Sequence, residues 1–134
     1  MKFLVMGLGS IGKRHIMNLI AEGIAPADIG GVDPREDRRQ ETKARFGMSQ
    51  VYARIEDSAK DNYDAAIICS PTSMHIDHAL WLAKRKTHLL IEKPLSATLK
   101  GVDTLAKIVK DNRLQVMVAY IFRFAPSIRK LKEL

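Results

Sequence analysis

A glycine pattern near the N-terminus constrains the fold of this chain more than any other feature of the sequence. Glycines at positions 7, 9 and 12 have the spacing G-x-G-x-x-G and directly follow the apolar run 3–6. Gly7 permits a tight turn, Gly9 lets a phosphate group approach the backbone, and Gly12 lets the next helix pack closely on the strand. The N-terminus of such a helix presents unpaired N–H groups to an anion. The pattern predicts a strand, a turn that binds the pyrophosphate of a dinucleotide, and a helix; a glycine turn without a ligand is the alternative.

Short apolar runs alternate with longer amphipathic stretches along the rest of the chain, which is typical of β-α-β units around a parallel sheet. Strands are expected at residues 3–6, 29–32, 50–53, 65–69, 88–91 and 115–119. Helices are expected at residues 11–22, 35–46, 55–61, 73–84 and 98–110, and Ile11 and Ile16 mark the apolar face of the first. This succession predicts a doubly wound α/β fold of the Rossmann type in residues 1–120. Residues 121–134 do not fit the sheet, and we interpret them as a linker to a second domain.

Length and composition indicate one domain with a real core, because the chain has 134 residues of which 46% are hydrophobic. No apolar run approaches the roughly 20 residues needed to cross a bilayer. The first residues lack the cleavage site of a signal peptide, and the single Cys69 cannot form an intrachain disulfide. We therefore expect a cytoplasmic protein that does not associate with membranes.

The net charge of +7 raises the question of nucleic acid, but the 22 basic residues are spread thinly along the sequence. No basic cluster contains the interleaved aromatic residues of a base-stacking surface. Solvated helix faces and attraction for an anionic cofactor or substrate explain this charge better. We expect no nucleic acid partner.

Asp33 follows the second expected strand and favours NAD as the cofactor. A carboxylate at this position accepts hydrogen bonds from both hydroxyls of the adenosine ribose. It also repels the 2′-phosphate of NADP. Arg35 complicates the choice, because an arginine two residues later can turn toward that phosphate, so NADP stays open.

Ser70, Pro71 and Thr72 follow the fourth expected strand, at the sheet edge where open α/β folds bind ligands. Their hydroxyls can contact a ribose or a phosphate, and we also expect Thr72 or Ser73 to cap the next helix. His75 lies one turn into that helix. It either faces the nicotinamide or is an ordinary helix histidine, exposed or hydrogen-bonded.

Glu92, Lys93 and Pro94 follow the fifth expected strand and form the most informative local motif. A lysine beside the crevice can hydrogen-bond a substrate hydroxyl and stabilise the alkoxide as a hydride departs. Pro94 fixes the local backbone, and a cis peptide bond is compatible with it. A solvated lysine at a strand end is the alternative.

Elsewhere, His15, His78 and His88 lack metal-ligand spacing, so we expect no metal site.

Together these motifs resemble the N-terminal part of the Gfo/Idh/MocA oxidoreductases. Four segments carry the resemblance in order, namely residues 7–15, 69–75, 92–96 and 120–124. The resemblance implies NAD(P)-dependent oxidoreduction of a sugar, polyol or nucleotide-sugar-like substrate, with Lys93 catalytic and its two neighbours orienting it. It also implies that His75 and Arg123 lie near the boundary between cofactor and substrate. The expected cofactor-binding residues are Gly7, Gly9, Ser10, Ile11, Gly12, Asp33, Arg35, Ser70, Pro71, Thr72, His75, Glu92, Lys93 and Arg123.

Two departures from the family pattern modify this expectation. Ile121 stands where the family often has asparagine, so one polar contact is missing. The family's second domain, with the substrate pocket and a catalytic histidine, is absent from these 134 residues. We therefore expect NAD(H) binding with little or no turnover, and self-association through apolar surface near residues 121–124. A nucleotide-binding or scaffolding module without chemistry is the alternative function.

Overall fold

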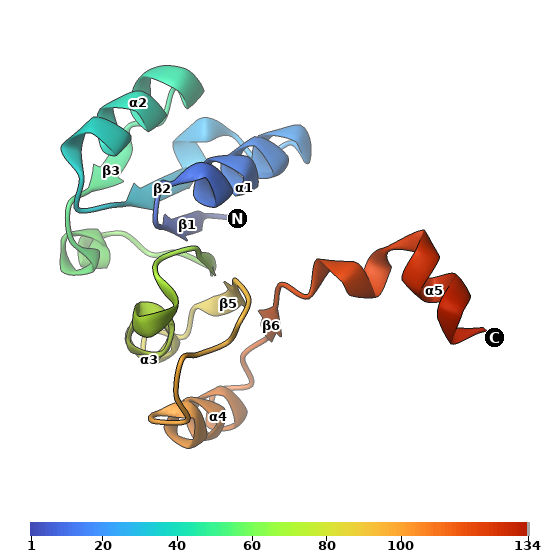
Figure 1. The fold of residues 1–134 in the computed structure, drawn as a ribbon. Helices are drawn as coiled ribbons and strands as arrows, with labels where there is room; N and C mark the ends of the chain where they lie inside the picture. Colours follow the sequence, from blue (N-terminus) through green and yellow to red (C-terminus); the bar gives the residue numbers. More distant parts are fainter. Residues whose placement is uncertain (134) are drawn as a thin grey trace.

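The expected parallel sheet is present in the computed structural model, which describes residues 1–133 (Figure 1). All of its strands are parallel, in the order β3-β2-β1-β4-β5-β6. The strands are β1 Phe3–Met6, β2 Ile29–Val32, β3 Gln50–Tyr52, β4 Ala65–Ile68, β5 His88–Ile91 and β6 Val116–Val118. The chain therefore winds outward from β1 in two directions, and the direction changes between β1 and β4. The doubly wound Rossmann fold is confirmed.

The register of the sheet brings the carboxyl ends of its central strands to one edge. Met6 of β1 pairs with Val32 of β2 and with Ile68 of β4, and Ile68 pairs with Ile91 of β5. The residues that follow these four strand ends are consequently neighbours in space, although they are far apart in the sequence. Ligands of open α/β sheets bind at this edge, near the change of winding direction.

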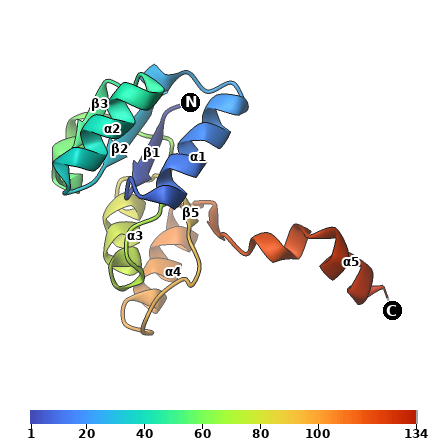
Figure 2. The same cartoon turned by 45° about the horizontal axis from the view of Figure 1, so that its top comes forward.

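Helices cover both faces of the sheet (Figures 1 and 2). They are α1 Ser10–Ala21, α2 Glu36–Phe46, α3 His75–Ala83, α4 Val102–Asp111 and α5 Pro126–Lys132, with short 3₁₀ helices at Pro26–Asp28, Ile55–Lys60, Thr72–Met74 and Ile121–Phe124. Successive residues of β1 point to opposite faces, so Leu4 packs in the cluster that includes α3 and α4. Val5 packs with Ile16 of α1 in the other cluster. Because both faces are covered, the central strands β1, β2 and β4 contain no polar side chain.

Three local expectations are wrong. The helix expected from residue 98 begins at Val102, because Gly101 at its N-cap has a φ of +82° that leaves the helical region. Ile11 is 47% exposed instead of facing the core, whereas Ile16 is fully buried. Thr72 and Ser73 do not cap α3, since a 3₁₀ turn precedes it and neither helix start has a side-chain cap.

The end of the described chain projects away from the sheet as an arm, which we define as residues 120–133 (Figures 1 and 2). Its large apolar side chains are exposed, namely Tyr120, Ile121, Phe122, Phe124, Ile128 and Leu131. In residues 1–133, no helix combines the length and the apolar character that a membrane span requires.

Candidate functional site

A cavity of about 550 Å³ opens at the carboxyl edge of the sheet, between the ends of β1, β2 and β4. It brings together six of the residues expected to bind a cofactor, namely Gly7, Gly9, Asp33, Arg35, Ser70 and Pro71. Arg38, Met74 and His78 also line it, although the sequence did not indicate them. Ala53 and Arg54, which follow β3, line it as well, so the cavity joins segments that follow four different strands.

The glycine loop forms one wall of this cavity, and each of its three glycines differs in what a Cβ would meet. Gly7 has a φ of +90°, and a Cβ there would lie 2.6 Å from the carbonyl oxygen of Cys69. A Cβ on Gly12 would lie 1.9 Å from the carbonyl oxygen of Gly7. A Cβ on Gly9 would meet only Nη1 of Arg38, at 3.8 Å, so the space beside Gly9 is open to a ligand. These contacts match the roles expected of the three glycines.

The N-terminus of α1 adjoins the open space beside Gly9. Gly9 is the N-cap of α1, no side chain caps the helix, and its first turn contains no acidic residue. The first N–H groups and the positive end of the helix dipole are therefore not neutralised by the chain itself. This environment suits a pyrophosphate.

Asp33 also lines the cavity, next to the glycine loop, and is only 2% exposed. Its Oδ2 accepts the N–H of Leu8 at 2.9 Å, and its Oδ1 accepts the N–H of Arg35 at 2.9 Å. The guanidinium of Arg38 lies 3.3 Å from Oδ2. A carboxylate has about four acceptor positions, so two remain for a ribose diol only when Arg38 moves aside.

The two arginines near Asp33 have different partners. The Arg35 side chain binds the carboxylate of Asp37, with a distance of 3.0 Å from Nε to Oδ1. This hydrogen bond raises the pKa of Arg35 and lowers that of Asp37. Of the two arginines, only Arg38 therefore places its guanidinium on the carboxylate of Asp33.

The hydroxyl of Ser70 is oriented by a histidine that the sequence did not single out. Ser70 Oγ lies 2.9 Å from Nδ1 of His78. Burial lowers the pKa of His78, which favours the neutral ring. In the neutral tautomer that carries its proton on Nε2, Nδ1 accepts a hydrogen bond from the Ser70 hydroxyl, which gives this hydroxyl a defined direction at the cavity wall.

The Glu92-Lys93-Pro94 segment lies at the same sheet edge but outside the cavity lining, and the Lys93 side chain is exposed. Glu92 Oε1 accepts a hydrogen bond from Nε2 of His15 on α1 at 2.9 Å. Glu92 Oε2 accepts the backbone N–H of Lys93 at 3.2 Å. The peptide bond between Lys93 and Pro94 is cis.

His75 is buried beneath the site and does not face an open ligand space. It is 1% exposed, with Nε2 at 2.8 Å from the Ser70 carbonyl oxygen and Nδ1 at 3.0 Å from the Pro94 carbonyl oxygen. Of the two interpretations of this histidine, the structure favours the hydrogen-bonded helix residue. Direct contact between its ring nitrogens and a cofactor is therefore not available in this geometry.

Comparison with known proteins agrees with this geometry. Residues 1–120 match the family model of an oxidoreductase family with an NAD-binding Rossmann fold, GFO_IDH_MocA. The chain belongs to the Gfo/Idh/MocA oxidoreductase family. It is 36% identical over 135 residues to the myo-inositol 2-dehydrogenase of Thermotoga maritima. This alignment covers 99% of this chain and 40% of that protein.

Two solved structures extend the comparison of this Gfo/Idh/MocA chain. A probable dehydrogenase from Thermotoga maritima has a TM-score of 0.88 and 34% identity, covering 99% of this chain and 40% of its own. A UDP-N-acetylglucosamine 3-dehydrogenase from Acidithiobacillus ferrooxidans has a TM-score of 0.85 and 26% identity. The match covers 99% of this chain and 42% of that chain. The chain spans about 40% of the length of the relatives it matches.

The remaining residues expected to bind the cofactor of this Gfo/Idh/MocA domain lie outside the cavity. Ser10, Ile11 and Gly12 form the first turn of α1, and Thr72 belongs to the 3₁₀ turn before α3. Arg123 is exposed on the arm.

Cys69 lines the cavity but was not among the residues expected to bind the cofactor. Burial raises the pKa of its thiol to about 12, so the thiol is protonated at neutral pH.

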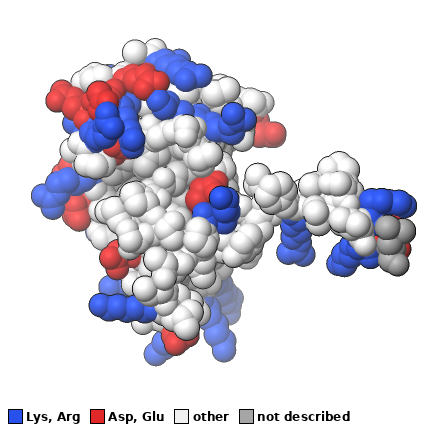
Figure 3. Space-filling model, in the orientation of Figure 1, with Lys and Arg blue, Asp and Glu red and all other residues white. Residues whose placement is uncertain are grey.

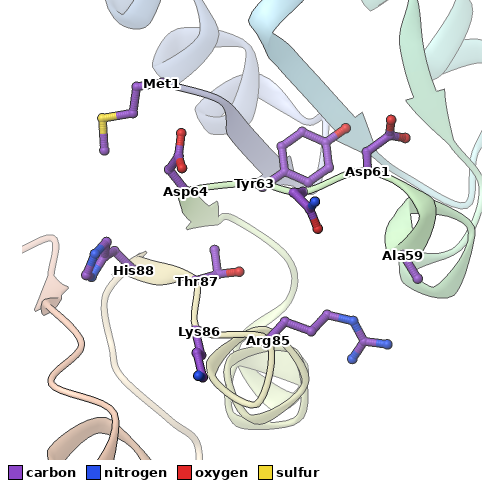
Figure 4. Close-up of a pocket in the computed structure, with 10 residues that line it drawn as sticks. Met1, Ala59, Asp61, Tyr63, Asp64, Arg85, Lys86, Thr87 and His88 are labelled. Carbon is purple, nitrogen blue, oxygen red and sulfur yellow. The ribbon is translucent and has the colours of Figure 1, made fainter.

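A second hollow, of about 680 Å³, lies at the opposite edge of the sheet (Figure 4). Two of its polar groups already have partners: Asp64 accepts the N–H of Lys2 at 2.7 Å, and Nδ1 of His88 accepts the N–H of Gln115 at 2.9 Å. Arg85 and Lys86, at the end of α3, point in different directions in Figure 4. No convergent set of groups forms there within residues 1–133.

Charge on this Gfo/Idh/MocA domain is distributed instead of gathered. Figure 3 shows Lys and Arg side chains scattered over the visible face, with Asp and Glu between them, and further basic side chains along the arm. The basic residues of the arm include Arg123, Arg129, Lys130 and Lys132. Among residues 1–133, no group of three His, Cys, Asp or Glu side chains has the arrangement of a metal site.

Proposed function

We propose that this chain binds NAD(H) in the cavity at the carboxyl edge of the sheet. One observation carries the proposal: the space beside Gly9 and the carboxylate of Asp33 open into the same cavity. In this arrangement the N-terminus of α1 would hold the pyrophosphate, and Asp33 would hold the adenosine ribose once Arg38 moves aside. Ser70, with its hydroxyl directed by His78, supplies a further polar contact.

We further propose that the protein transfers a hydride between the nicotinamide and a sugar, polyol or nucleotide-sugar-like substrate. Two similar proteins support this substrate class, since one is named for myo-inositol and the other for UDP-N-acetylglucosamine. When bound, the nicotinamide supplies the hydride acceptor or donor. The Lys93 ammonium would hydrogen-bond the substrate oxygen and stabilise its developing negative charge as the carbon is oxidised, while the catalytic histidine that the family resemblance places in the second domain would take up the hydroxyl proton.

We propose residues 1–120 as the nucleotide domain and residues 121–134 as the link to a substrate domain. The relatives support this division, because the chain spans only about 40% of their length. The exposed apolar side chains of the arm support contact with other protein surface. Sedimentation of the 134-residue chain over a range of concentrations tests whether a second copy provides that surface.

A fluorescence titration with NADH tests the proposed function. We expect a saturable change in NADH emission with the 134-residue chain, and competition by ADP-ribose. Replacing Asp33 with Ala should weaken NADH binding, because the ribose loses its acceptor. Absence of saturable NADH binding by the wild-type chain would contradict the nucleotide proposal.

The hydride-transfer proposal needs a second measurement. Candidate inositols and UDP-sugars are added to the chain with NAD⁺, and NADH formation is followed by its absorbance. We expect nucleotide binding with little or no turnover from the 134-residue chain, because the family resemblance puts the substrate pocket in a second domain. Turnover at the rate of ordinary dehydrogenases would contradict this expectation. In a protein that carries the substrate domain, Lys93→Ala should abolish turnover while NADH still binds.

A further inference from the structure

Lys93 lies between two residues that are each held by a histidine from a different helix. His15 of α1 contacts the side chain of Glu92, and His75 of α3 contacts the backbone carbonyl of Pro94. The segment thus follows β5 but is tied to helices on both faces of the sheet. We propose that His15 and His75 are positioning residues, which set the direction in which Lys93 leaves the sheet edge. This inference rests on the proposed function, in which Lys93 hydrogen-bonds the substrate oxygen.

The contact made by His15 reaches the backbone of Lys93 through one carboxylate. His15 Nε2 donates to Oε1 of Glu92 at 2.9 Å, while Oε2 of the same carboxylate accepts the Lys93 N–H at 3.2 Å. The side chains of His15 and Glu92 are only 18% and 19% exposed, so water competes for this pair less than at an open surface. Rotation of the carboxylate is limited, and so is movement of the N–H that it binds.

The position of His15 also links Lys93 to the nucleotide end of the site. α1 begins beside the glycine loop, and His15 lies in its second turn. The helix whose N-terminus faces the proposed pyrophosphate position therefore also holds Glu92. One rigid element fixes the distance between the glycine loop and the lysine segment.

The contact made by His75 holds the other side of Lys93. Its ring is 1% exposed and lies between the carbonyl oxygens of Ser70 and Pro94, at 2.8 and 3.0 Å. The ring nitrogen that carries the proton donates to the carbonyl oxygen that it faces. The ring therefore joins the loop after β4 to the loop after β5, and a buried ring with two such partners has little freedom to turn.

The side chains of Gln and Asn allow the two ring nitrogens to be tested separately. The amide nitrogen of Gln reaches about as far as Nε2 of histidine, whereas that of Asn reaches about as far as Nδ1. His15→Gln therefore keeps the donor to Glu92, and His15→Asn and His15→Leu remove it. His75→Asn keeps the donor to Pro94, and His75→Leu removes it. His88→Gln, at the far end of β5, is the matched control.

The measurement is the ¹⁵N order parameter of the Lys93 amide in the 134-residue chain. We expect a value of about 0.85 in the wild type, typical of rigid backbone, and values near 0.6 in His15→Asn and His15→Leu. His15→Gln and His88→Gln should retain the wild-type value. Urea unfolding of each variant checks that the effect is local, because a general loss of stability would affect order throughout the sheet.

A wild-type order parameter in both His15→Asn and His15→Leu would overturn the inference for His15, as would an equal loss in His88→Gln. His75→Asn against His75→Leu tests the second contact in the same way. If the buried His75 variants do not fold, the His15 set alone decides whether histidine contacts position Lys93. NADH added to the same samples tests the proposed function separately. Failure of the wild type to bind NADH would reject that function without affecting the comparison of order parameters.

Discussion

Replacing Gly9 with Ala should weaken nucleotide binding while leaving the fold intact. Gly9 has φ −72° and ψ −166°, a conformation that alanine adopts without strain. The new Cβ would have only Nη1 of Arg38 near it, at 3.8 Å, and would occupy the space proposed for the pyrophosphate. Gly12→Ala is the opposite case, because its Cβ would lie 1.9 Å from the backbone oxygen of Gly7.

The two substitutions differ in their expected free energies of unfolding. For Gly9→Ala, a poorer N-cap costs about 0.5–1 kcal/mol, and the loss of unfolded-state entropy returns about 0.4–1 kcal/mol. The net change is within about 0.5 kcal/mol of zero. For Gly12→Ala, α1 must move by about 1 Å to restore contact distance. Overpacking of this kind costs about 1–3 kcal/mol or more, against a gain of about 1 kcal/mol from helix propensity.

Urea unfolding and NADH titration of each variant test this reasoning. We expect the Kd of Gly9→Ala for NADH to rise at least about tenfold, which is about 1.4 kcal/mol. Gly23→Ala is the control, because Gly23 has a φ of +88° and no atom within 4 Å of a new Cβ. It should lose about 1–2 kcal/mol through backbone strain and bind NADH as the wild type does. Wild-type NADH affinity in Gly9→Ala, or a loss of stability above about 2 kcal/mol, would refute the argument.

Three further predictions concern single side chains. Thr42 is fully buried and its hydroxyl has no partner among the described residues. Thr42→Val should therefore raise the free energy of unfolding by about 1 kcal/mol. A lower urea midpoint in this variant would contradict the prediction. Arg38→Ala should raise the ratio of the Kd for NADPH to the Kd for NADH at least about tenfold, because Arg38 lies on Asp33 and Arg35 does not. Arg35→Ala, the control, should leave that ratio unchanged. Burial lowers the folded-state pKa of His78 below 6.5, so its contribution to stability is present above pH 6.5 and is lost as the pH falls through the folded-state pKa. His78→Gln should flatten the acid side of the stability profile measured by urea unfolding, and an unchanged slope would count against a buried neutral ring.

The sheet and the glycine loop could be predicted from sequence because their signals are local. The apolar runs of β1 and β2 match the expected strands residue for residue. The steric demand on Gly12 arises within a single strand-turn-helix unit, because its Cβ would meet the carbonyl of Gly7. Such features depend on residues close in sequence, where propensity and spacing are informative.

The partners within the site could not be predicted, because they depend on the order of the strands and on the direction of each side chain. His15 and Glu92 are separated by 77 positions, and they meet only because β5 lies two places from β1 in the sheet. Arg35 and Arg38 differ by less than one helical turn, yet Arg35 binds Asp37 and Arg38 reaches back to Asp33. Composition and spacing carry no information on such a difference in direction.

The central place of β1 has a consequence for how the chain is made. Strand β1 is synthesised before the other strands of this sheet and lies in its middle, bonded on one side to β2 and on the other to β4. One edge of β1 therefore stays without its partner until the ribosome has added residues 65–68. During that interval an apolar strand edge is available to other chains. Slower translation between β2 and β4 should increase aggregation of the nascent protein, and a chaperone that covers β1 should reduce it.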